Sequence, residues 1–159
     1  MAGGPQISNH QEKIGQKIDA AFAQAGQRAS GPRRLITDHL VQLAGSGQGF
    51  TADELWQRLK TINLSIGRAT VFRSIRSLVE LSILDCIERI DGVRLYRVCG
   101  EGIFEGQDHH HHLVCTGCHR IVEFHYCLPT NQLDQIGEQE HFKIAKHTLT
   151  IYGQCQDCA

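Results

Sequence analysis

The sequence predicts an α+β protein with an N-terminal winged helix-turn-helix domain and a small C-terminal α/β domain. Three observations lead to this fold class. Residues 1–98 carry four helical patterns followed by a hairpin signal. Residues 99–108 are rich in glycine and acidic side chains, which indicates a hinge or linker. Residues 109–159 alternate short extended segments with one helical pattern, which is typical of a small mixed domain.

Two helices are predicted before residue 44. The first spans Lys13–Ala25, where apolar side chains recur on one helical face, and Gly26 ends it. The second spans Pro32–Leu43, because proline suits a first helical turn and apolar residues again recur at helical spacing. The glycine-rich segment Ala44–Gly49 is then a loop.

Two further helices and a short turn complete the helical part. Thr51 and Glu54 fit a capping box, in which the hydroxyl and the carboxylate each accept a free backbone N–H. The third helix therefore starts at Thr51 and carries an apolar stripe to Ile62. After a turn at Asn63–Gly67, a fourth helix runs to about Leu81.

A hairpin follows the fourth helix. Asp85–Ile90 and Val93–Val98 are extended runs on either side of Asp91-Gly92, a dipeptide that favours a tight turn. Helices in this order, followed by a hairpin, predict a winged helix-turn-helix domain.

The C-terminal part holds four predicted elements. His111–Cys115 and Arg120–Phe124 are expected to be strands around a Cys-x-x-Cys turn. Thr130–Glu140 is expected to be a short helix capped by Thr130 or Asn131, and Lys143–Tyr152 a strand because it alternates.

Charge is divided unevenly along the chain. Residues 1–83 hold ten Lys and Arg against six Asp and Glu; residues 84–159 hold six against eleven, with eight of the ten His and all seven Cys. The first part is therefore suited to a polyanion and the second to cations. No signal peptide or membrane-spanning run is visible, so we expect a cytoplasmic protein whose cysteines bind metal rather than form disulfides.

Two cysteine pairs lie in the C-terminal part. Cys115 and Cys118 form one Cys-x-x-Cys pair, and Cys155 and Cys158 form another. Zinc takes four ligands in a tetrahedron and thiolates suit it, so two pairs predict a closed structural zinc site. The alternative is a thiol–disulfide site, which usually needs a βαβ context that this pattern lacks.

Four consecutive histidines, His109–His112, precede the first pair. Alternate side chains of a strand share a face, so His110 and His112 point one way and His109 and His111 the other. The run therefore offers two half-sites, but imidazole suits zinc, iron, copper and nickel alike. The alternative is a solvated polar loop.

The fourth helix carries exposed basic side chains beside its apolar stripe. Arg68, Phe72, Arg73 and Arg76 lie along one side, as in a helix that enters the major groove of DNA. Arg33 and its neighbour Arg34 are expected to add phosphate contacts from the second helix. The alternative is an ordinary solvated basic face.

These segments together resemble the ferric uptake regulator superfamily, over about Gln27 to Cys158. Gly67–Arg73 resembles the family's recognition-helix signature G-x-A-T-V-Y-R, with Thr70 matching and Phe72 in place of tyrosine. The other matching segments are His109–Cys118, Ile121–Phe124, His147–Gly153 and the pair Cys155 with Cys158. The resemblance implies a winged-helix DNA-binding domain, a hinge and a dimerisation domain, in a homodimeric repressor that binds palindromic operator DNA when loaded with metal.

The resemblance also implies metal sites. Carried over residue by residue, the structural zinc ligands are Cys115, Cys118, Cys155 and Cys158. Iron and peroxide sensors of the family use a histidine before the third helix, where this chain has Gln48–Thr51, and a carboxylate where it has Arg97. Zinc sensors instead use a cysteine after the wing, which Cys99 matches, and a hinge-side residue, which Asp85 matches. The implied branch is therefore the zinc uptake regulators, with Asp85, Cys99, His110 and His112 as sensing ligands. Cys86 and Glu88 lie close enough to compete with Asp85.

A further family site would use His109, His111 and His147 with a carboxylate at the start of the C-terminal helix. Pro129–Gln132 contains no acid at that point. Cys86 and Cys127 are interpreted as small buried residues.

The function that these features predict is a zinc-responsive transcriptional regulator of zinc-homeostasis genes, with Zn²⁺ in structural and regulatory roles. Sensing ligands on both sides of the hinge would fix the spacing of two recognition helices across the dimer. The alternatives are an iron- or peroxide-responsive regulator of the same superfamily, a metal-storage module, or a zinc hydrolase. No H-E-x-x-H motif is present, so we do not expect an enzyme.

Overall fold

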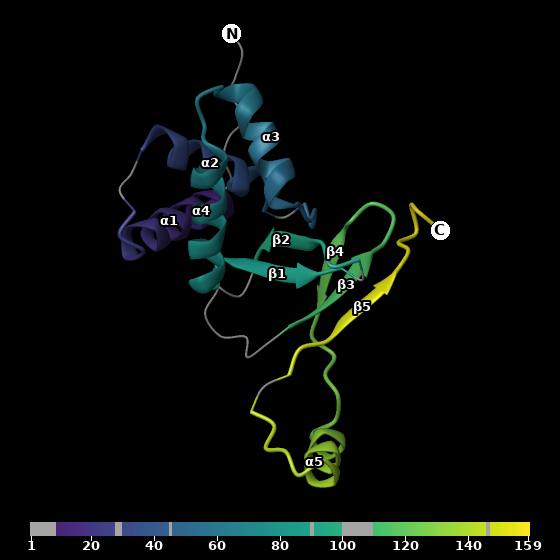
Figure 1. Cartoon of the computed structure of the whole chain (residues 1–159). Coiled ribbons are helices and arrows are strands. Elements are labelled where there is room, and N and C mark those ends of the chain that lie inside the picture. The colour runs from purple at the N-terminus through teal and green to yellow at the C-terminus, as the bar shows by residue number, and fades with distance from the viewer. Residues whose placement is uncertain (1–8, 28–29, 45, 90, 100–109, 146) are drawn as a thin grey trace. The chain divides into compact units, whose positions relative to one another are not determined.

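The computed structural model describes residues 9–27, 30–44, 46–89, 91–99, 110–145 and 147–159. The chain divides into two compact units, residues 1–106 and residues 107–159 (Figure 1). Helices and small sheets occur together, so the predicted α+β class is confirmed. The predicted linker at residues 99–108 lies, apart from Cys99, outside the described residues.

The first unit contains the four predicted helices. They are α1 (Asn9–Gln24), α2 (Gly31–Leu43), α3 (Ala52–Ile62) and α4 (Arg68–Glu80). Their apolar stripes form one core, in which Ile18, Ile36, Leu55 and Leu78 are completely buried. The helix α1 begins at Asn9, before the predicted Lys13. The prediction missed this start because the first residues of the helix are polar and show no apolar periodicity.

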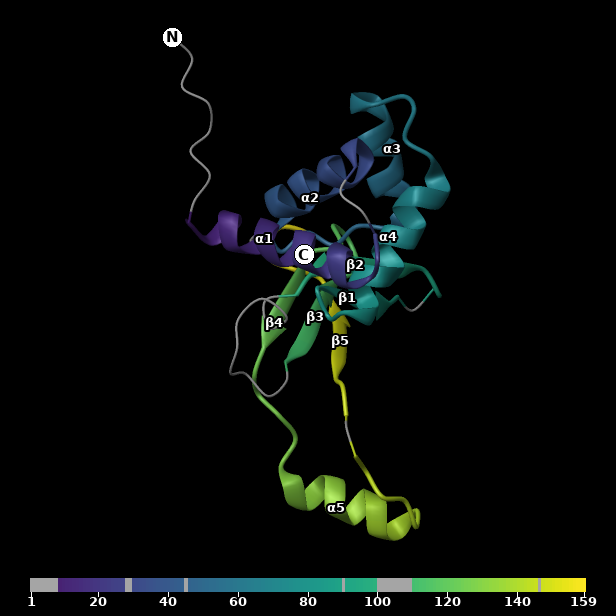
Figure 2. The same ribbon diagram turned by 90° about the vertical axis from the view of Figure 1, so that its left-hand side faces the viewer.

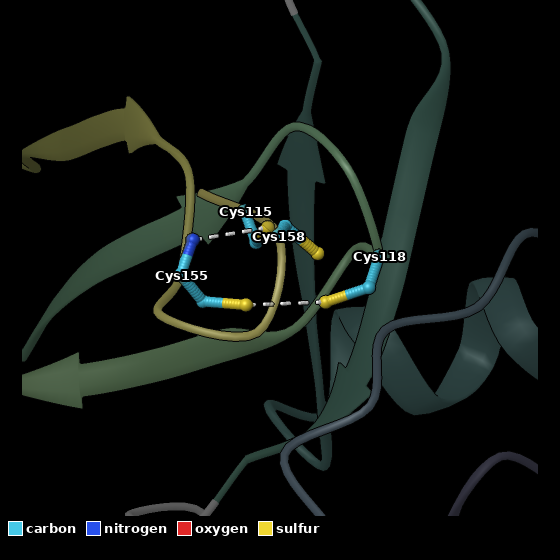
Figure 3. A group of neighbouring side chains, drawn as sticks. All are labelled: Cys115, Cys118, Cys155 and Cys158. Atoms are coloured by element: carbon cyan, nitrogen blue, oxygen red, sulfur yellow. Dashed lines mark hydrogen bonds between the residues drawn. The ribbon is translucent and has the colours of Figure 1, made fainter.

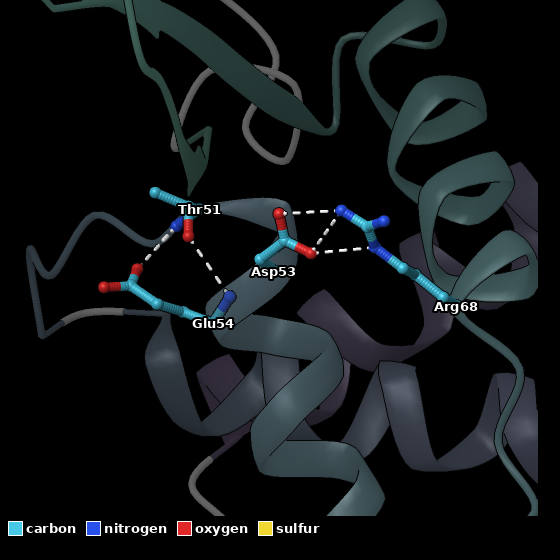
Figure 4. Close-up of polar contacts among 4 residues, drawn as sticks. All are labelled: Thr51, Asp53, Glu54 and Arg68. Carbon is cyan, nitrogen blue, oxygen red and sulfur yellow. Dashed lines mark hydrogen bonds and ion pairs between the residues drawn. The ribbon is translucent and has the colours of Figure 1, made fainter.

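The start of α3 is fixed by the predicted capping box, which is confirmed. The Glu54 N–H donates to Thr51 Oγ1 at 3.1 Å, and the Thr51 N–H donates to Glu54 Oε2 at 2.7 Å (Figure 4). These bonds satisfy two of the backbone donors that a helix start leaves without intrahelical partners. The same turn positions Asp53 at the beginning of the helix.

The predicted hairpin follows α4. Strands β1 (Leu84–Glu88) and β2 (Arg94–Val98) are antiparallel, with Leu84 opposite Val98 and Glu88 opposite Arg94. Gly92 in the connecting turn has φ +79°, a backbone conformation that glycine adopts without strain. A bridge between Phe50 and Tyr96 ties the segment before α3 to this hairpin.

The second unit is a three-stranded sheet with one helix. Strand β3 (His111–Cys115) lies between β4 (Ile121–Phe124), which is antiparallel to it, and β5 (Thr150–Gly153), which is parallel. The helix α5 (Thr130–Gln139) lies in the crossover between β4 and β5. Both Figure 1 and Figure 2 show α5 away from the sheet, joined to it by two extended segments.

Two expectations for this unit are wrong in detail. Neither Thr130 nor Asn131 caps α5; its N-cap is Pro129, which makes no side-chain cap bond. The strand predicted over Lys143–Tyr152 is confined to Thr150–Gly153, because only those residues lie beside β3. Within the described part of the chain, no helix is both long and apolar enough to cross a membrane.

Candidate metal centres and nucleic-acid interface

The two cysteine pairs meet at one end of the three-stranded sheet. Cys115 ends β3, Cys118 closes the β3–β4 turn, and Cys155 and Cys158 follow β5 (Figure 3). One sulfur from each of the four lies within 4.8 Å of the others, and the Sγ atoms of Cys118 and Cys155 are 3.6 Å apart. A disulfide would need about 2 Å, whereas thiolates around one zinc ion lie about 3.8 Å apart. The arrangement therefore suits a tetrahedral ion.

Hydrogen bonds hold the two cysteine turns together. The Cys155 N–H donates to Cys115 Sγ at 3.3 Å, and the Thr116 N–H donates to the Gly153 carbonyl at 2.8 Å. An ion pair between Arg120 and Asp157, at 3.1 Å, joins the strand after the first pair to the second pair. These contacts connect segments that are about forty residues apart in sequence, as one closed metal site would require.

The thiols of this group have strongly different proton affinities. Backbone N–H groups of Cys118 and Cys155 lower the pKa of Cys115 to about 6. Hydrogen bonding to the Cys155 and Cys118 side chains raises the pKa of Cys158 to about 12, and burial raises the pKa of Cys155. Four thiolates at this separation repel one another, so a bound cation is what allows all four to be deprotonated.

A second group of possible metal ligands consists of His110, His112 and Glu123. The rings of His110 and His112 are 4.7 Å apart, edge to face. Glu123 lies opposite His112 in β4, and its Oε1 is 3.9 Å from His110 Nε2. Each of these three side chains offers a ligand atom within 4.8 Å of the others. Sequence reasoning missed Glu123, although the pairing of β3 with β4 around the cysteine turn would have indicated it.

The two other predicted sensing ligands belong to the first unit. Asp85 lies in β1 opposite Arg97, and Cys99 is buried just after β2, where its N–H donates to the Ile83 carbonyl at 2.8 Å. Strand alternation turns Cys86 and Glu88 to the face opposite Asp85, which reduces their competition with it.

Two of the three histidines predicted for a third site, His111 and His147, lie together. His109 lies outside the described residues. His111 is 1% exposed and packs against Phe124 and His147, with ring centroids 5.4 and 5.2 Å away. The structure brings Cys127 to the same place, with Sγ 3.0 Å from His147 Nε2.

The interpretation of Cys86 and Cys127 as small buried residues is wrong. Cys86 is exposed in β1, and Cys127 is half-buried beside His147. No local sequence pattern indicated the contact of Cys127 with His147, because the crossover through α5 brings these two residues together.

The basic face of α4 is turned to solvent. Arg68, Phe72, Arg73 and Arg76 are exposed, whereas Val71, Ser74, Ile75 and Leu78 are buried. Thr70, in the first turn of the helix, is half-buried. Arg33 of α2 donates from Nε to Gln27 Oε1 at 3.0 Å. Such an arginine-bearing helix, buried along one side, has the geometry of a major-groove reader.

One arginine of this face is held by an acidic side chain. Arg68 makes two hydrogen bonds to the Asp53 carboxylate, at 2.9 Å from Nε and 3.0 Å from an Nη (Figure 4). Its guanidinium also lies 4.8 Å from the centre of the Phe72 ring. The sequence did not identify Asp53 as a partner of Arg68. An acidic residue in the first turn of a helix is usually explained by its favourable interaction with the helix dipole.

The fold and these sites define a class: a metal-binding protein built on a winged helix-turn-helix unit with an exposed basic helix. Comparison with known proteins gives the family. The sequence profile of the ferric uptake regulator family matches residues 24–152. The chain is 34% identical over 127 residues to the ferric uptake regulation protein of Bacillus subtilis, covering 80% of this chain and 83% of that one.

Two solved structures are similar in fold. The ferric uptake regulator of Vibrio cholerae matches with a TM-score of 0.60 at 26% identity, over 86% of this chain and 98% of that one. A zinc uptake regulator complexed with zinc and DNA matches with a TM-score of 0.65 at 16% identity, over 94% and 95%. The chain belongs to the ferric uptake regulator family. It is therefore a metal-responsive transcriptional regulator and not an enzyme.

Proposed function

We propose that this regulator responds to zinc and binds palindromic operator DNA as a metal-loaded homodimer, controlling zinc-homeostasis genes in the cytoplasm. The proposed structural zinc ligands are Cys115, Cys118, Cys155 and Cys158. The proposed sensing ligands are Asp85 and Cys99 from the first unit with His110 and His112 from the second. The proposed DNA contacts are Arg33, Arg68, Thr70, Phe72, Arg73 and Arg76.

The observation that carries the choice of zinc is the thiol at Cys99. A thiolate combined with imidazoles favours zinc over ferrous iron or manganese, which prefer harder ligands. The buried Cys99 thiol at the end of β2 is the residue type that distinguishes this set from an all-nitrogen-and-oxygen site.

The mechanism follows from where these ligands lie in the chain. An ion held jointly by the two units fixes the recognition helices at one separation, and two half-sites of a palindrome demand one separation. Metal and DNA then strengthen each other's binding by the same factor, typically 5- to 150-fold in coupled systems.

A homodimer is supported by an apolar stripe across the three-stranded sheet. Leu113 lies opposite both Val122 of β4 and Ile151 of β5, and the three side chains are 42, 46 and 44% exposed. They line a hollow of about 190 Å³. An exposed cross-strand stripe of this kind is suited to pairing with the same stripe of a second copy.

The function is tested by fluorescence anisotropy of an operator-like palindrome, with buffered free zinc and, anaerobically, ferrous iron. Zinc should drive binding at low free concentration, and Cys99→Ser should abolish that response. Cys86→Ser is the matched control, since it removes an exposed thiol from the neighbouring strand and should leave the response intact.

One observation favours a second candidate, an iron-responsive regulator. Glu123 with His110 and His112 is a nitrogen-and-oxygen set that suits iron without any thiol. In that case iron drives operator binding, Cys99→Ser leaves the metal dependence of operator binding unchanged, and Glu123→Gln abolishes it.

A further inference from the structure

A glutamine between α1 and α2 joins three parts of the first unit through its side-chain amide. Gln27 Nε2 donates to the hydroxyl of Ser77 on α4 at 2.5 Å. Gln27 Oε1 accepts from Nε of Arg33 on α2 at 3.0 Å. The amide therefore connects a proposed phosphate contact on α2 with the basic helix α4, whose Ser77 is 50 residues away in sequence.

The backbone at Gln27 is fixed by the way α1 ends. Gly26 has φ +67°, and its N–H donates to the Ala23 carbonyl at 3.0 Å. The Gln27 N–H donates to the Phe22 carbonyl at 2.8 Å. These two bonds and the left-handed glycine form a Schellman motif, a common end of a helix. Because Phe22 is buried in the core, the side chain of Gln27 starts from a rigid point.

The two neighbours determine which way the amide of Gln27 faces. A glutamine amide donates through its nitrogen and accepts through its oxygen, whereas an arginine can only donate. Arg33 therefore requires the amide oxygen, and the amide nitrogen then faces Ser77. The reverse orientation would set two donors against each other. Since Ser77 is half-buried on α4, the direction of the amide follows the position of that helix.

A hydrogen bond at Nε restrains the plane of the Arg33 guanidinium. Nε is the nitrogen closest to the aliphatic part of the side chain, so fixing it orients the whole planar group. Arginine binds phosphate oxygens through a planar fork of donors, and a fork that is already oriented loses less side-chain freedom on binding. The bond from Gln27 thus prepares Arg33 to meet a phosphate.

We infer that Gln27 is a positioning residue for DNA binding, which sets the phosphate contact of Arg33 in register with the base contacts of α4. Phosphate contacts fix where a protein sits on the duplex, and base contacts read the sequence. A link between the two makes them act together on one half-site. The inference rests on the proposed DNA-binding face and does not depend on which metal the protein senses.

The inference is tested by the salt dependence of DNA binding by the full-length, metal-loaded protein, using anisotropy with an operator-like palindrome and with an unrelated duplex. In Gln27→Met, affinity for the palindrome should fall about threefold to tenfold, the range expected for one hydrogen bond. The slope of log affinity against log salt concentration should become shallower by up to about 0.9 for each chain bound, the contribution of one phosphate contact. Gln132→Met, at an exposed glutamine of α5 in the second unit, is the matched control and should behave as wild type.

A double-mutant cycle separates positioning from a general effect on folding. Gln27→Met should change the salt slope in the wild-type background but not in Arg33→Ala, where the phosphate contact is already missing. Ser77→Ala is a milder change that releases the other end of the amide, and it should reproduce part of the Gln27→Met loss. The inference is overturned if the slope is unchanged in both Gln27→Met and Ser77→Ala, or if Gln27→Met changes it equally with and without Arg33.

Failure of the proposed zinc response gives a different result. In that case zinc does not strengthen binding of wild type to the palindrome. The salt slope on the unrelated duplex still reports the contact of Arg33, because every duplex offers the same phosphates. A shallower slope in Gln27→Met on that duplex supports the inference, and an unchanged slope overturns it, whichever metal is sensed.

Discussion

Gly117 lies between the two cysteines of the first pair, where a side chain would crowd Cys158. A Cβ on this residue would come within 3.0 Å of both Cβ and Sγ of Cys158. Contacts that short force the neighbour to move, and here the neighbour is one of the four sulfur ligands. Because Gly117 has no side chain, Cys158 can keep its position among the four sulfur ligands.

Gly117→Ala should weaken zinc binding at the four-cysteine group by about tenfold, since overpacking costs about 1–3 kcal/mol. Competition for zinc with a chromophoric chelator measures the change. Gly153→Ala is the matched control, because a Cβ there has no atom within 4 Å. Equal zinc affinity in the two variants would show that the crowding at Gly117 relaxes without disturbing the sulfurs.

Zinc binding at this group should also release protons. The raised pKa values of Cys155 and Cys158 keep both thiols protonated near pH 7.5 in the metal-free protein, whereas zinc binds thiolates. Zinc added to chelator-stripped protein in weak buffer should therefore release two or more protons per ion, read with a pH indicator. Affinity must then fall as pH falls. A titration without proton release would contradict these pKa directions.

At the scale of elements, the helices of the first unit were predictable because each of them shows apolar residues recurring at helical spacing along a short stretch of sequence. The capping box at Thr51 and the Asp91-Gly92 turn are likewise local signals. The extent of β5 was not predictable, since it depends on which residues lie beside β3. The contact of Cys127 with His147 was hidden for the same reason, because a crossover rather than a motif creates it.

Thr51→Ala should destabilise the first unit by about 1 kcal/mol, the usual cost of losing an N-cap side chain. The protein's single tryptophan, Trp56, lies in α3, so its fluorescence during urea unfolding reports on this unit. Thr61→Ala is the control, because the Thr61 hydroxyl donates to the Arg58 carbonyl within the same helix. Equal unfolding midpoints for the two variants would mean that the capping box contributes nothing measurable.

The pairing of Arg68 with Asp53 belongs to the same scale, because it links α4 to α3. Both side chains are about half exposed, so the pair adds little stability. A guanidinium held by a carboxylate can still present its remaining donors to guanine in a fixed direction.

Asp53→Asn should therefore narrow the ratio of operator to unrelated-DNA affinity by about tenfold, since one bidentate base contact discriminates by about 1–3 kcal/mol. Anisotropy with both DNAs at one salt concentration measures the ratio. Asp134→Asn is the control, as it neutralises an exposed carboxylate of α5 in the second unit, away from the proposed DNA contacts. A ratio that is unchanged in Asp53→Asn would show that Asp53 does not orient Arg68 for base reading.

At the scale of the whole molecule, the division of charge corresponds to a division of tasks. The arginines proposed to contact DNA lie on helices of the first unit, and the four-cysteine group and the histidine run lie in the second. Sequence composition was sufficient to predict that division, whereas the ligand sets depended on strand register. A palindromic operator adds one requirement that a single chain cannot meet, which is a two-fold axis relating two basic helices.

The two-fold axis of the dimer is expected to pass through the apolar stripe of Leu113, Val122 and Ile151. Leu113→Glu places a charge at the centre of the stripe and should dissociate the dimer, because an unpaired buried charge is strongly unfavourable. Sedimentation equilibrium should show a monomer whose zinc content matches wild type. Operator affinity should fall at least a hundredfold, since each half-site is then bound independently. Val93→Glu is the control, an exposed apolar residue of the first unit. If Leu113→Glu remains dimeric, the pairing surface lies elsewhere, and the exposed Ile136 and Phe142 around α5 become the side chains to replace.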